Sequence, residues 1–309
     1  MANETWSAKI QGILTLDLSR EVRFRDDRKS LFLDLLGLVE GMTILDVGCG
    51  PGTLTRKLSK WLDQDTKIIG LDRDTAFVEY ARGQAVKMNL SNIDYIVGDA
   101  LQLPLDDNSV DACISHTVIE HVPHREFLLE QKRVCRPEGR VSVMWARPDK
   151  YIKTEPAALP PRSEREAELM EKLFKESSEV LEEHNVGKYW PDPVALPTLF
   201  QHLGFCDVQV DAIAVPIAID DARNSLQEKM ALVEAQRNQA YESVDMAARL
   251  GEPRLSRTEL TELRTLVNAR SKGSTPASTL WTHSFRQKEN SANFFLSVGL
   301  LSVKQLTSW

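Results

Sequence analysis

The sequence predicts an α/β fold in which helices cover both faces of a mostly parallel sheet. Short apolar runs alternate with amphipathic runs at the spacing of βαβ units across residues 41–150. A glycine-rich turn, Gly48-Cys49-Gly50-Pro51-Gly52, follows the first apolar run and precedes a helical pattern. Acidic residues stand at the ends of the next two apolar runs, which is typical of a ligand site at the carboxyl edge of such a sheet.

The first 150 residues divide into a helical segment and a core. Residues 1–40 are expected to be helical, with one helix over Leu14–Leu38 that Gly41 ends, because leucines there form an apolar face among charged residues. The core is expected over residues 41–150. Its strands are predicted at Thr43–Val47, Lys67–Asp72, Ile93–Val97, Val110–Ser115 and Gly139–Trp145. Its helices are predicted at Leu54–Leu62, Thr75–Asn89 and Arg125–Cys135.

After Trp145 the alternation breaks, and we expect two helical insertions. The first covers residues 151–192 and holds one helix over Glu164–Glu183; the second covers residues 216–290 and holds two or three helices over Asp220–Ser271. Between them the core continues over residues 193–215, with a helix over Pro193–Leu203 and a sixth strand over Val208–Val215. A last strand over Phe294–Leu306, within residues 291–309, is expected to return to the sheet antiparallel. The predicted whole is a doubly wound, Rossmann-like sheet of seven strands with the insertions as a cap.

The composition favours a small-molecule partner. The net charge is −7, whereas proteins that bind phosphate backbones usually carry a basic face, so no nucleic-acid partner is expected. The N-terminus lacks a basic and then apolar leader, and no apolar segment approaches the roughly 20 residues of a spanning helix. The four cysteines are scattered and not at metal-ligand spacing with histidines, so no metal site is expected. We expect a cytoplasmic protein without a membrane partner. The sequence does not indicate its oligomeric state.

The glycine turn alone is compatible with two classes of nucleotide cofactor. It differs by one residue from the dinucleotide fingerprint G-x-G-x-x-G, because Thr53 stands where that motif has its third glycine. Asp72 ends the second predicted strand, where a carboxylate can accept bonds from two ribose hydroxyls; it can equally cap a helix or form a turn. Asp99 follows the third strand, where it can reach an adenine edge or form a Gly-Asp turn.

The ordered motifs together resemble one family. Class I S-adenosylmethionine (SAM)-dependent methyltransferases have successive motifs similar to Asp46-Val47-Gly48-Cys49-Gly50-Pro51-Gly52, Gly70-Leu71-Asp72, Gly98-Asp99-Ala100-Leu101 and Val110-Asp111-Ala112-Cys113-Ile114-Ser115. The ubiquinone/menaquinone-biosynthesis C-methyltransferase-like branch has segments similar to Ile119-Glu120-His121-Val122 and Arg133-Val134-Cys135-Arg136-Pro137-Glu138-Gly139. The resemblance covers about Leu36–Ala146 and returns at Leu196–Val210. It departs from the family pattern at Glu138, which stands at the first glycine of the family's usual Pro-Gly-Gly turn.

The resemblance implies SAM as cofactor and a set of residues that bind it. Asp46 would lie near the amino group of SAM, Asp72 would hold the ribose, and Asp99 would read the adenine edge. In many relatives an arginine or tyrosine upstream of the first strand also touches SAM, and the candidates here are Arg23, Arg25 and Arg28. The implied cofactor-binding set is Asp46, Gly48, Gly50, Asp72, Arg73, Asp99, Ala100 and Ser115.

Catalytic and acceptor-binding residues are harder to predict, because methyl transfer is an in-line displacement that mainly requires positioning. His116, which would line the sulfonium side, and His121 are tentative candidates for a general base, since an imidazole titrates near neutral pH. For His121 a structural contact of its loop is the competing interpretation. Trp145, Tyr189 and Trp190 are tentative candidates for an apolar acceptor pocket, or else seal the cap against the core.

The favoured hypothesis is SAM-dependent methyl transfer to a small-molecule acceptor under a helical lid. A SAM-binding protein with other chemistry, or with a regulatory role, has the same cofactor motifs and stays an alternative. A nicotinamide-dependent oxidoreductase is disfavoured by Thr53 and by the Gly98-Asp99-Ala100 motif. The sequence leaves open the identity of the acceptor, the atom that is methylated, the use of a base and the pathway.

Overall fold

A computed structural model describes residues 5–146, 160–174, 182–216, 221–249, 255–272 and 295–305. The chain divides into two compact units. The helical unit contains Met1–Val22, Ile152–Glu183 and Pro216–Phe295. The sheet unit contains Arg23–Tyr151, His184–Val215 and Leu296–Trp309.

The sheet unit is built on strands in the order β3-β2-β1-β4-β5-β7-β6. Strands β1 to β5 pair in parallel, and β7 pairs antiparallel with β5. The strands are β1 (Thr43–Val47), β2 (Lys67–Asp72), β3 (Ile93–Val97), β4 (Val110–His116), β5 (Cys135–Ala146), β6 (Phe205–Pro216) and β7 (Phe295–Gln305). The predicted α/β, Rossmann-like core with a parallel sheet is confirmed. Because the strand order reverses between β1 and β4, the ligand crevice of this topology lies beyond the carboxyl ends of these two strands.

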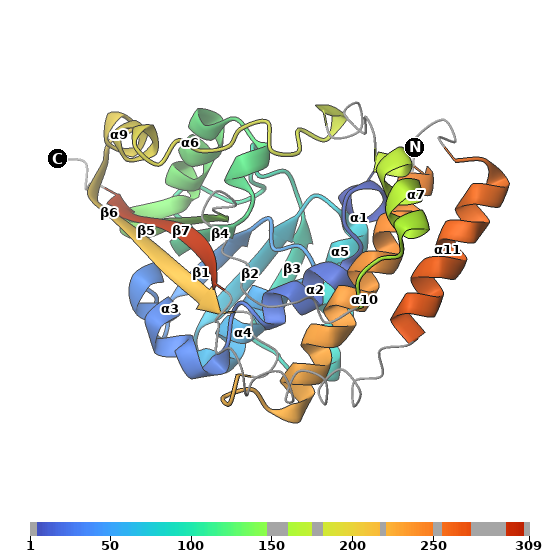
Figure 1. The fold of residues 1–309 in the computed structure, drawn as a ribbon. Helices are drawn as coiled ribbons and strands as arrows, with labels where there is room; N and C mark the ends of the chain where they lie inside the picture. Colours follow the sequence, from blue (N-terminus) through green and yellow to red (C-terminus); the bar gives the residue numbers. More distant parts are fainter. Residues whose placement is uncertain are drawn as a thin grey trace. The chain divides into compact units, whose positions relative to one another are not determined.

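Helices lie on both sides of this sheet, as Figure 1 shows for α3 (Lys29–Leu36) and α4 (Thr53–Trp61) against α6 (His124–Val134) and α9 (Ala195–His202). On one face, fully buried apolar side chains of the strands, which include Val47, Cys113 and Val143, pack in one cluster with Phe127 of α6 and Phe200 of α9. Alternate strand residues face the other side, where Ser142 donates to the backbone oxygen of Leu36 in α3. Two covered faces explain why the strands are apolar at nearly every position.

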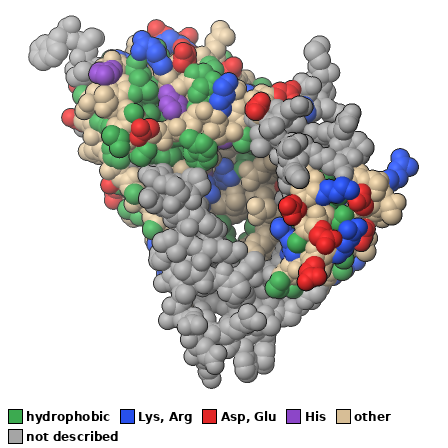
Figure 2. Space-filling view, turned by 45° about the horizontal axis from the view of Figure 1, so that its top comes forward, with side chains coloured by type: hydrophobic (Ala, Val, Ile, Leu, Met, Phe, Trp, Pro, Cys, Tyr) green, Lys and Arg blue, Asp and Glu red, His purple; other side chains and the backbone are tan. Residues whose placement is uncertain are grey.

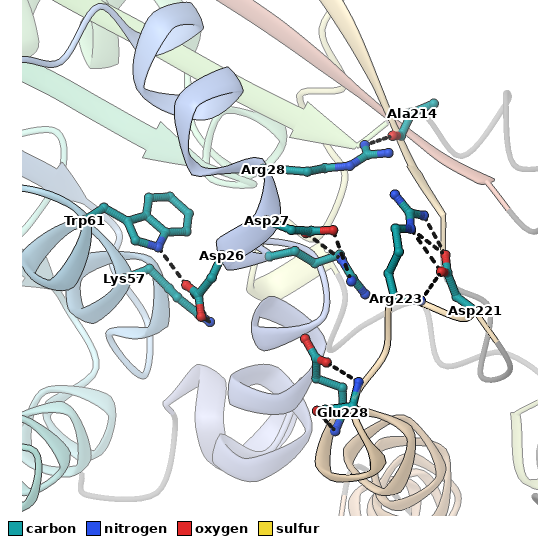
Figure 3. A network of polar contacts seen from close by, with 11 residues as sticks. Asp26, Asp27, Arg28, Lys57, Trp61, Ala214, Asp221, Arg223 and Glu228 are labelled. Carbon is teal, nitrogen blue, oxygen red and sulfur yellow. Dashed lines mark hydrogen bonds and ion pairs between the residues drawn. The ribbon is translucent and has the colours of Figure 1, made fainter.

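The single helix predicted over Leu14–Leu38 is wrong. Helix α2 (Ile13–Glu21) ends, a 3-10 turn η1 (Asp26–Arg28) follows, and α3 begins at Lys29. The break forms because the Asp26 carboxylate accepts a hydrogen bond from Trp61 Nε1 at 2.7 Å and lies 3.3 Å from Lys57 Nζ, both on α4 (Figure 3). Gly37, with a φ of 66°, ends α3 four residues before the predicted Gly41.

The remaining elements of the sheet unit differ from the prediction mainly at their ends. Helix α5 (Thr75–Lys87) lies between β2 and β3. Strand β4 runs one residue further, to His116, and β5 begins at Cys135 directly after α6. Strand β6 begins at Phe205, three residues before the predicted start.

The helical unit contains five described helices: α1 (Trp6–Lys9), α2, α7 (Glu164–Phe174), α10 (Leu226–Arg249) and α11 (Arg257–Lys272). Helices α7, α10 and α11 share an apolar core with Leu255; it consists of Leu169, Met170, Leu173, Val244, Leu255, Leu263 and Val267. Figure 2 shows acidic and basic side chains interleaved on the surface of this unit, and Arg165 pairs there with Glu262 at 2.9 Å. The end of the predicted helix Glu164–Glu183 falls partly outside the described residues. None of the described helices is both long and apolar enough to cross a bilayer.

Candidate cofactor site

The glycine turn between β1 and α4 takes a backbone path that requires glycine. Gly48, Gly50 and Gly52 have φ values of 70°, 55° and 78°. A Cβ on Gly48 would stand 2.4 Å from Val118 Cγ2. The backbone N–H groups of Gly48 and Cys49 both donate to the carbonyl oxygen of Leu71, at 2.7 and 2.9 Å. The turn is therefore fixed across the end of β2 and beside the segment that follows β4.

Asp72, at the end of β2, completes this turn. Its Oδ2 accepts from the backbone N–H of Gly50 at 2.8 Å, and its Oδ1 accepts from that of Asp74 at 2.9 Å. The helix N-cap is Asp74, whose side chain accepts from Ala76 N at 3.0 Å, so the alternative in which Asp72 caps a helix is wrong. Asp72 instead holds the glycine turn while its remaining lone pairs stay available for a ligand.

Asp46, at the end of β1, is a second carboxylate at the same edge. It is 1% exposed and accepts a hydrogen bond from Thr55 Oγ1 at 2.7 Å. Burial, with a contribution from the charge of Asp72, raises the pKa of Asp46 to about 7. Burial also raises the pKa of Asp72 to about 6, against the two N–H donors that favour its charged form. Neighbouring carboxylates whose charged forms are disfavoured are characteristic of a site that receives a cation or hydroxyl donors.

The third strand end behaves differently. Asp99 is exposed, and its Oδ1 accepts from the backbone N–H of Leu101 at 2.9 Å. The structure thus shows the Gly-Asp turn that was the alternative for Asp99. Arg73 is exposed and Ala100 is half-buried. A role for these three residues in binding adenine stays a prediction.

The end of β4 carries Ser115 and His116. Ser115 is fully buried opposite Val47 of β1, and among the described residues its Oγ has no hydrogen-bond partner. His116 is 7% exposed, and its Nε2 lies 2.8 Å from Arg23 Nη1. Its ring packs edge-on against Phe24 with 4.9 Å between ring centroids. These residues lie at the β1–β4 crevice, as their positions in the sequence predicted.

His121 lies in a different environment. Its Nδ1 accepts a hydrogen bond from the backbone N–H of Gly187 at 3.0 Å. Nearby, Tyr189 N donates to the carbonyl oxygen of Glu120 at 3.0 Å, and His124 Nε2 lies 2.7 Å from the carbonyl oxygen of Tyr189. His121 is therefore part of the anchor that holds residues 184–190, in agreement with the structural interpretation of this histidine.

The three aromatic candidates do not form one group. Trp145 is 2% exposed in the apolar core with Val143 and Phe200. Tyr189 is half-buried beside His124. Trp190 is 50% exposed. Their role in an acceptor pocket stays a prediction.

Two further charged residues lie at the same edge: Arg23, which the sequence offered as one of three candidate arginines, and Glu120, to which it assigned no role. Of these arginines, Arg25 pairs with Asp27 and Arg28 donates to the carbonyl oxygen of Ala214 at 2.7 Å (Figure 3). Arg23 alone of the three is bonded to His116. Glu120 is 1% exposed, and its Oε1 accepts from the backbone N–H of Ala146 at 3.0 Å.

These two residues interact electrostatically. Burial lowers the pKa of Arg23 to about 10, and the negative charge of Glu120 opposes that change. The contact between Arg23 and His116 cannot be identified from local sequence, because the two residues stand 93 residues apart.

The observed residues fit the cofactor that the motifs imply. SAM carries an α-amino cation and two ribose hydroxyls. These groups are donors, and the remaining lone pairs of Asp46 and Asp72 can accept from them. The fully buried Ser115 hydroxyl lies at the same edge without a hydrogen-bond partner among the described residues. A ligand with polar groups at this edge would satisfy all three side chains.

Comparison with known proteins agrees with this interpretation. Residues 45–143 match a family model described as "Methyltransferase domain". The sheet unit is built around a class I SAM-dependent methyltransferase domain. The chain is 28% identical, over 62% of its length and 78% of theirs, to demethylmenaquinone methyltransferases of Staphylococcus aureus. It is 33% identical to the sterol 24-C-methyltransferase erg6 of Aspergillus fumigatus over 39% of this chain and 32% of that protein.

The methyltransferase domain also has structural neighbours. A phosphoethanolamine N-methyltransferase 2 of Haemonchus contortus, solved with S-adenosyl-L-methionine, aligns with a TM-score of 0.52 and 16% identity over 99% of this chain and 60% of that one. At this identity the likeness concerns the fold alone. The chain spans about a third of the length of the sterol methyltransferase and of two other curated relatives, at 32%, 32% and 31%.

Proposed function

We propose that the protein transfers the methyl group of SAM to a small-molecule acceptor by in-line displacement at the sulfonium. The observation that carries the proposal is the pair of carboxylates, buried Asp46 and half-buried Asp72, around a fixed glycine turn at the carboxyl ends of β1 and β2 in a methyltransferase domain. The demethylmenaquinone and sterol methyltransferases among the relatives are named for small-molecule acceptors, which supports an acceptor of this kind.

Each residue of the site has a proposed task. Asp46 binds the amino group of the cofactor and Asp72 the ribose, while Gly48 and Gly50 face its methionine part. Arg73, Asp99 and Ala100 surround the adenine, and Ser115 faces the sulfonium side. When bound, SAM supplies an activated methyl group, so the protein needs chiefly to align the acceptor and exclude water.

We also propose that the helical unit is the lid over the acceptor, and that the acceptor touches Tyr189 and Trp190. The sequence predicts cap insertions at residues 151–192 and 216–290, and the helical unit contains most of both together with residues 1–22. The amphipathic helices of the helical unit, packed on a core of their own, support a role as a folded cap rather than a linker.

The test has two stages. Thermal-shift scans with SAM, S-adenosylhomocysteine and NAD identify the cofactor class, and we expect stabilisation by the first two alone. A metabolite extract incubated with methyl-labelled SAM then identifies an acceptor by the label it gains. Stabilisation by NAD alone would overturn the cofactor assignment. Binding of SAM without any labelled product across broad extracts would favour the alternative, a SAM-binding protein with other chemistry or a regulatory role.

A further inference from the structure

The contact between Arg23 and His116 determines where the proton of His116 lies. Arg23 Nη1 is 2.8 Å from His116 Nε2; His116 is buried, and Arg23 is half-buried with its Nε enclosed in the protein. A guanidinium has five N–H donors, no acceptor and a charge that it keeps in proteins. The hydrogen bond can therefore form only if Nε2 offers a lone pair. It follows that His116 is neutral and that its proton is on Nδ1.

The Arg23 cation favours the same state, because at 2.8 Å from Nε2 it repels a second positive charge on the imidazole. The negative charges of nearby carboxylates act in the opposite direction. Glu120, on the turn after β4, contributes a negative charge that acts on Arg23. Asp46 is on the neighbouring strand, on the same face, two register positions before His116. Phe24, which packs on the ring from the segment before η1, carries no charge.

The surroundings of Arg23 restrain the pair. Arg23 is half-buried, its Nε is enclosed, and the charge of the buried Glu120 attracts it. Moving Arg23 away would leave the Glu120 carboxylate without this cation. The imidazole is also restrained from the other side by the edge-on contact with Phe24.

We propose that Arg23 is a positioning residue that fixes His116 as the Nδ1–H tautomer, so that His116 is a hydrogen-bond donor of the site and not its general base. This reverses the role that the sequence suggested for His116. The tautomer is inferred from the contact between Arg23 and His116, whereas its consequence for catalysis rests on the proposed methyl transfer. An acceptor in this site must then lose any proton by another route or be a nucleophile without one to lose.

The decisive experiment is NMR of the full chain labelled with 15N at histidine. The His116 signals are assigned by their loss in His116→Gln. We expect Nε2 to have the chemical shift of an unprotonated ring nitrogen and Nδ1 that of a protonated one at neutral pH. On acidification to about pH 5.5, below the ordinary histidine pKa of about 6.5, His116 should stay neutral. A cationic His116, or the Nε2–H tautomer, at neutral pH would overturn the proposal.

Variants separate positioning from general structural support. In Arg23→Met, His116 should become protonated on acidification to pH 5.5, and in Arg23→Lys, which retains a donor and a charge, it should stay neutral. Arg25→Met removes a buried arginine from the same segment without touching His116, and should leave its spectrum unchanged. If Arg23→Met does not fold, Arg23→Lys still tests the proposal. A folded lysine variant in which His116 becomes protonated at pH 5.5 would contradict the role of Arg23 as a charged donor to Nε2.

The catalytic consequence has its own readout. With a labelled acceptor in hand, the rate of methyl transfer at saturating substrate should show no titration step from His116 in the wild type, and such a step should appear in Arg23→Met. A wild-type step that His116→Gln abolishes would overturn the assignment of His116 as a donor. Since the NMR experiment requires no turnover, it tests the tautomer of His116 independently of the proposed function.

Discussion

Asp46 and Asp72 make the site sensitive to pH. Both carboxyl groups have a pKa in the folded protein above the unfolded value, so the folded state binds more protons than the unfolded state between about pH 4 and pH 7. The free energy of unfolding should therefore fall as the pH rises through this window. A bound α-amino cation favours the charged form of Asp46 and so offsets the free-energy cost of holding that charge in the protein interior.

We predict that S-adenosylhomocysteine binds at least about tenfold more weakly at pH 5.5 than at pH 7.5, because a carboxyl group with a pKa of about 7 is mostly protonated at the lower pH. Isothermal titration calorimetry at both values measures this, and should show proton release near neutral pH. Asp46→Asn should weaken binding at pH 7.5 and reduce its pH dependence. Asp65→Asn, at an exposed carboxylate, is the control. Equal wild-type affinities at both pH values would contradict the assignment of Asp46.

Gly48 allows a second prediction about single residues. Gly41 and Gly48 both have positive φ, but a Cβ on Gly41 meets nothing within 4 Å, whereas one on Gly48 would collide with Val118. Gly41→Ala should lower the free energy of unfolding by about 1–2 kcal/mol, the cost of the left-handed backbone. Gly48→Ala should cost about 1–3 kcal/mol more, from overpacking. Urea titrations measure both, and Gly48→Ala/Val118→Ala should recover part of the difference; no recovery would mean that the collision is relieved elsewhere.

At the scale of elements, η1 depends on a contact with α4. The Asp26 carboxylate accepts from Trp61 Nε1, and Trp61 is only 8% exposed. Asp26→Ala should destabilise the protein by about 1–2 kcal/mol, since the buried indole N–H is left unsatisfied. Asp26→Asn, which retains an acceptor, should cost less, and Asp65→Ala, at an exposed carboxylate, serves as the control. Chemical denaturation measures all three, and equal effects of Asp26→Ala and Asp65→Ala would contradict this role of Asp26.

This contact should also depend on pH. Burial opposes ionisation of Asp26, but the Trp61 hydrogen bond and the Lys57 charge outweigh it and lower the pKa of Asp26. A carboxyl group with a lowered pKa stabilises the fold above its unfolded pKa, and that stabilisation is lost as the pH falls through the folded value. The stability difference between wild type and Asp26→Ala should accordingly shrink in acid. A difference that stays constant down to strongly acidic pH would contradict an ionic contribution.

The same elements show what can be predicted from sequence. Strands β1, β2 and β3 match their predicted ranges end to end, because each is a short, mostly apolar run with turn residues or carboxylates at its limits. The break before η1 could not be predicted, since its partner Trp61 is 35 residues away. The carboxylates of the site follow strand ends and are visible in the sequence. Arg23 and Glu120 acquire their roles only through tertiary contacts.

At the scale of the whole molecule, the helical unit has a polar centre of its own. Glu166 is 1% exposed, and its Oε1 lies 2.9 Å from both Arg270 Nε and Arg270 Nη2. This pair joins α7 to α11, two helices that the chain separates by α10. Breaking a buried pair by removing one partner leaves an uncompensated charge, whereas replacing both partners with apolar residues of similar volume is often tolerated.

We therefore predict that Arg270→Met destabilises the helical unit by about 3–5 kcal/mol, and that Glu166→Met/Arg270→Met restores most of this loss. Chemical denaturation followed by circular dichroism measures both changes. All residues of the proposed cofactor site belong to the sheet unit, so S-adenosylhomocysteine affinity should stay within about twofold of wild type in both variants under native conditions. If the helical unit is the acceptor lid, Arg270→Met should impair methyl transfer while that affinity persists. Loss of cofactor affinity in step with the stability of the helical unit would instead show that the cofactor site requires this unit.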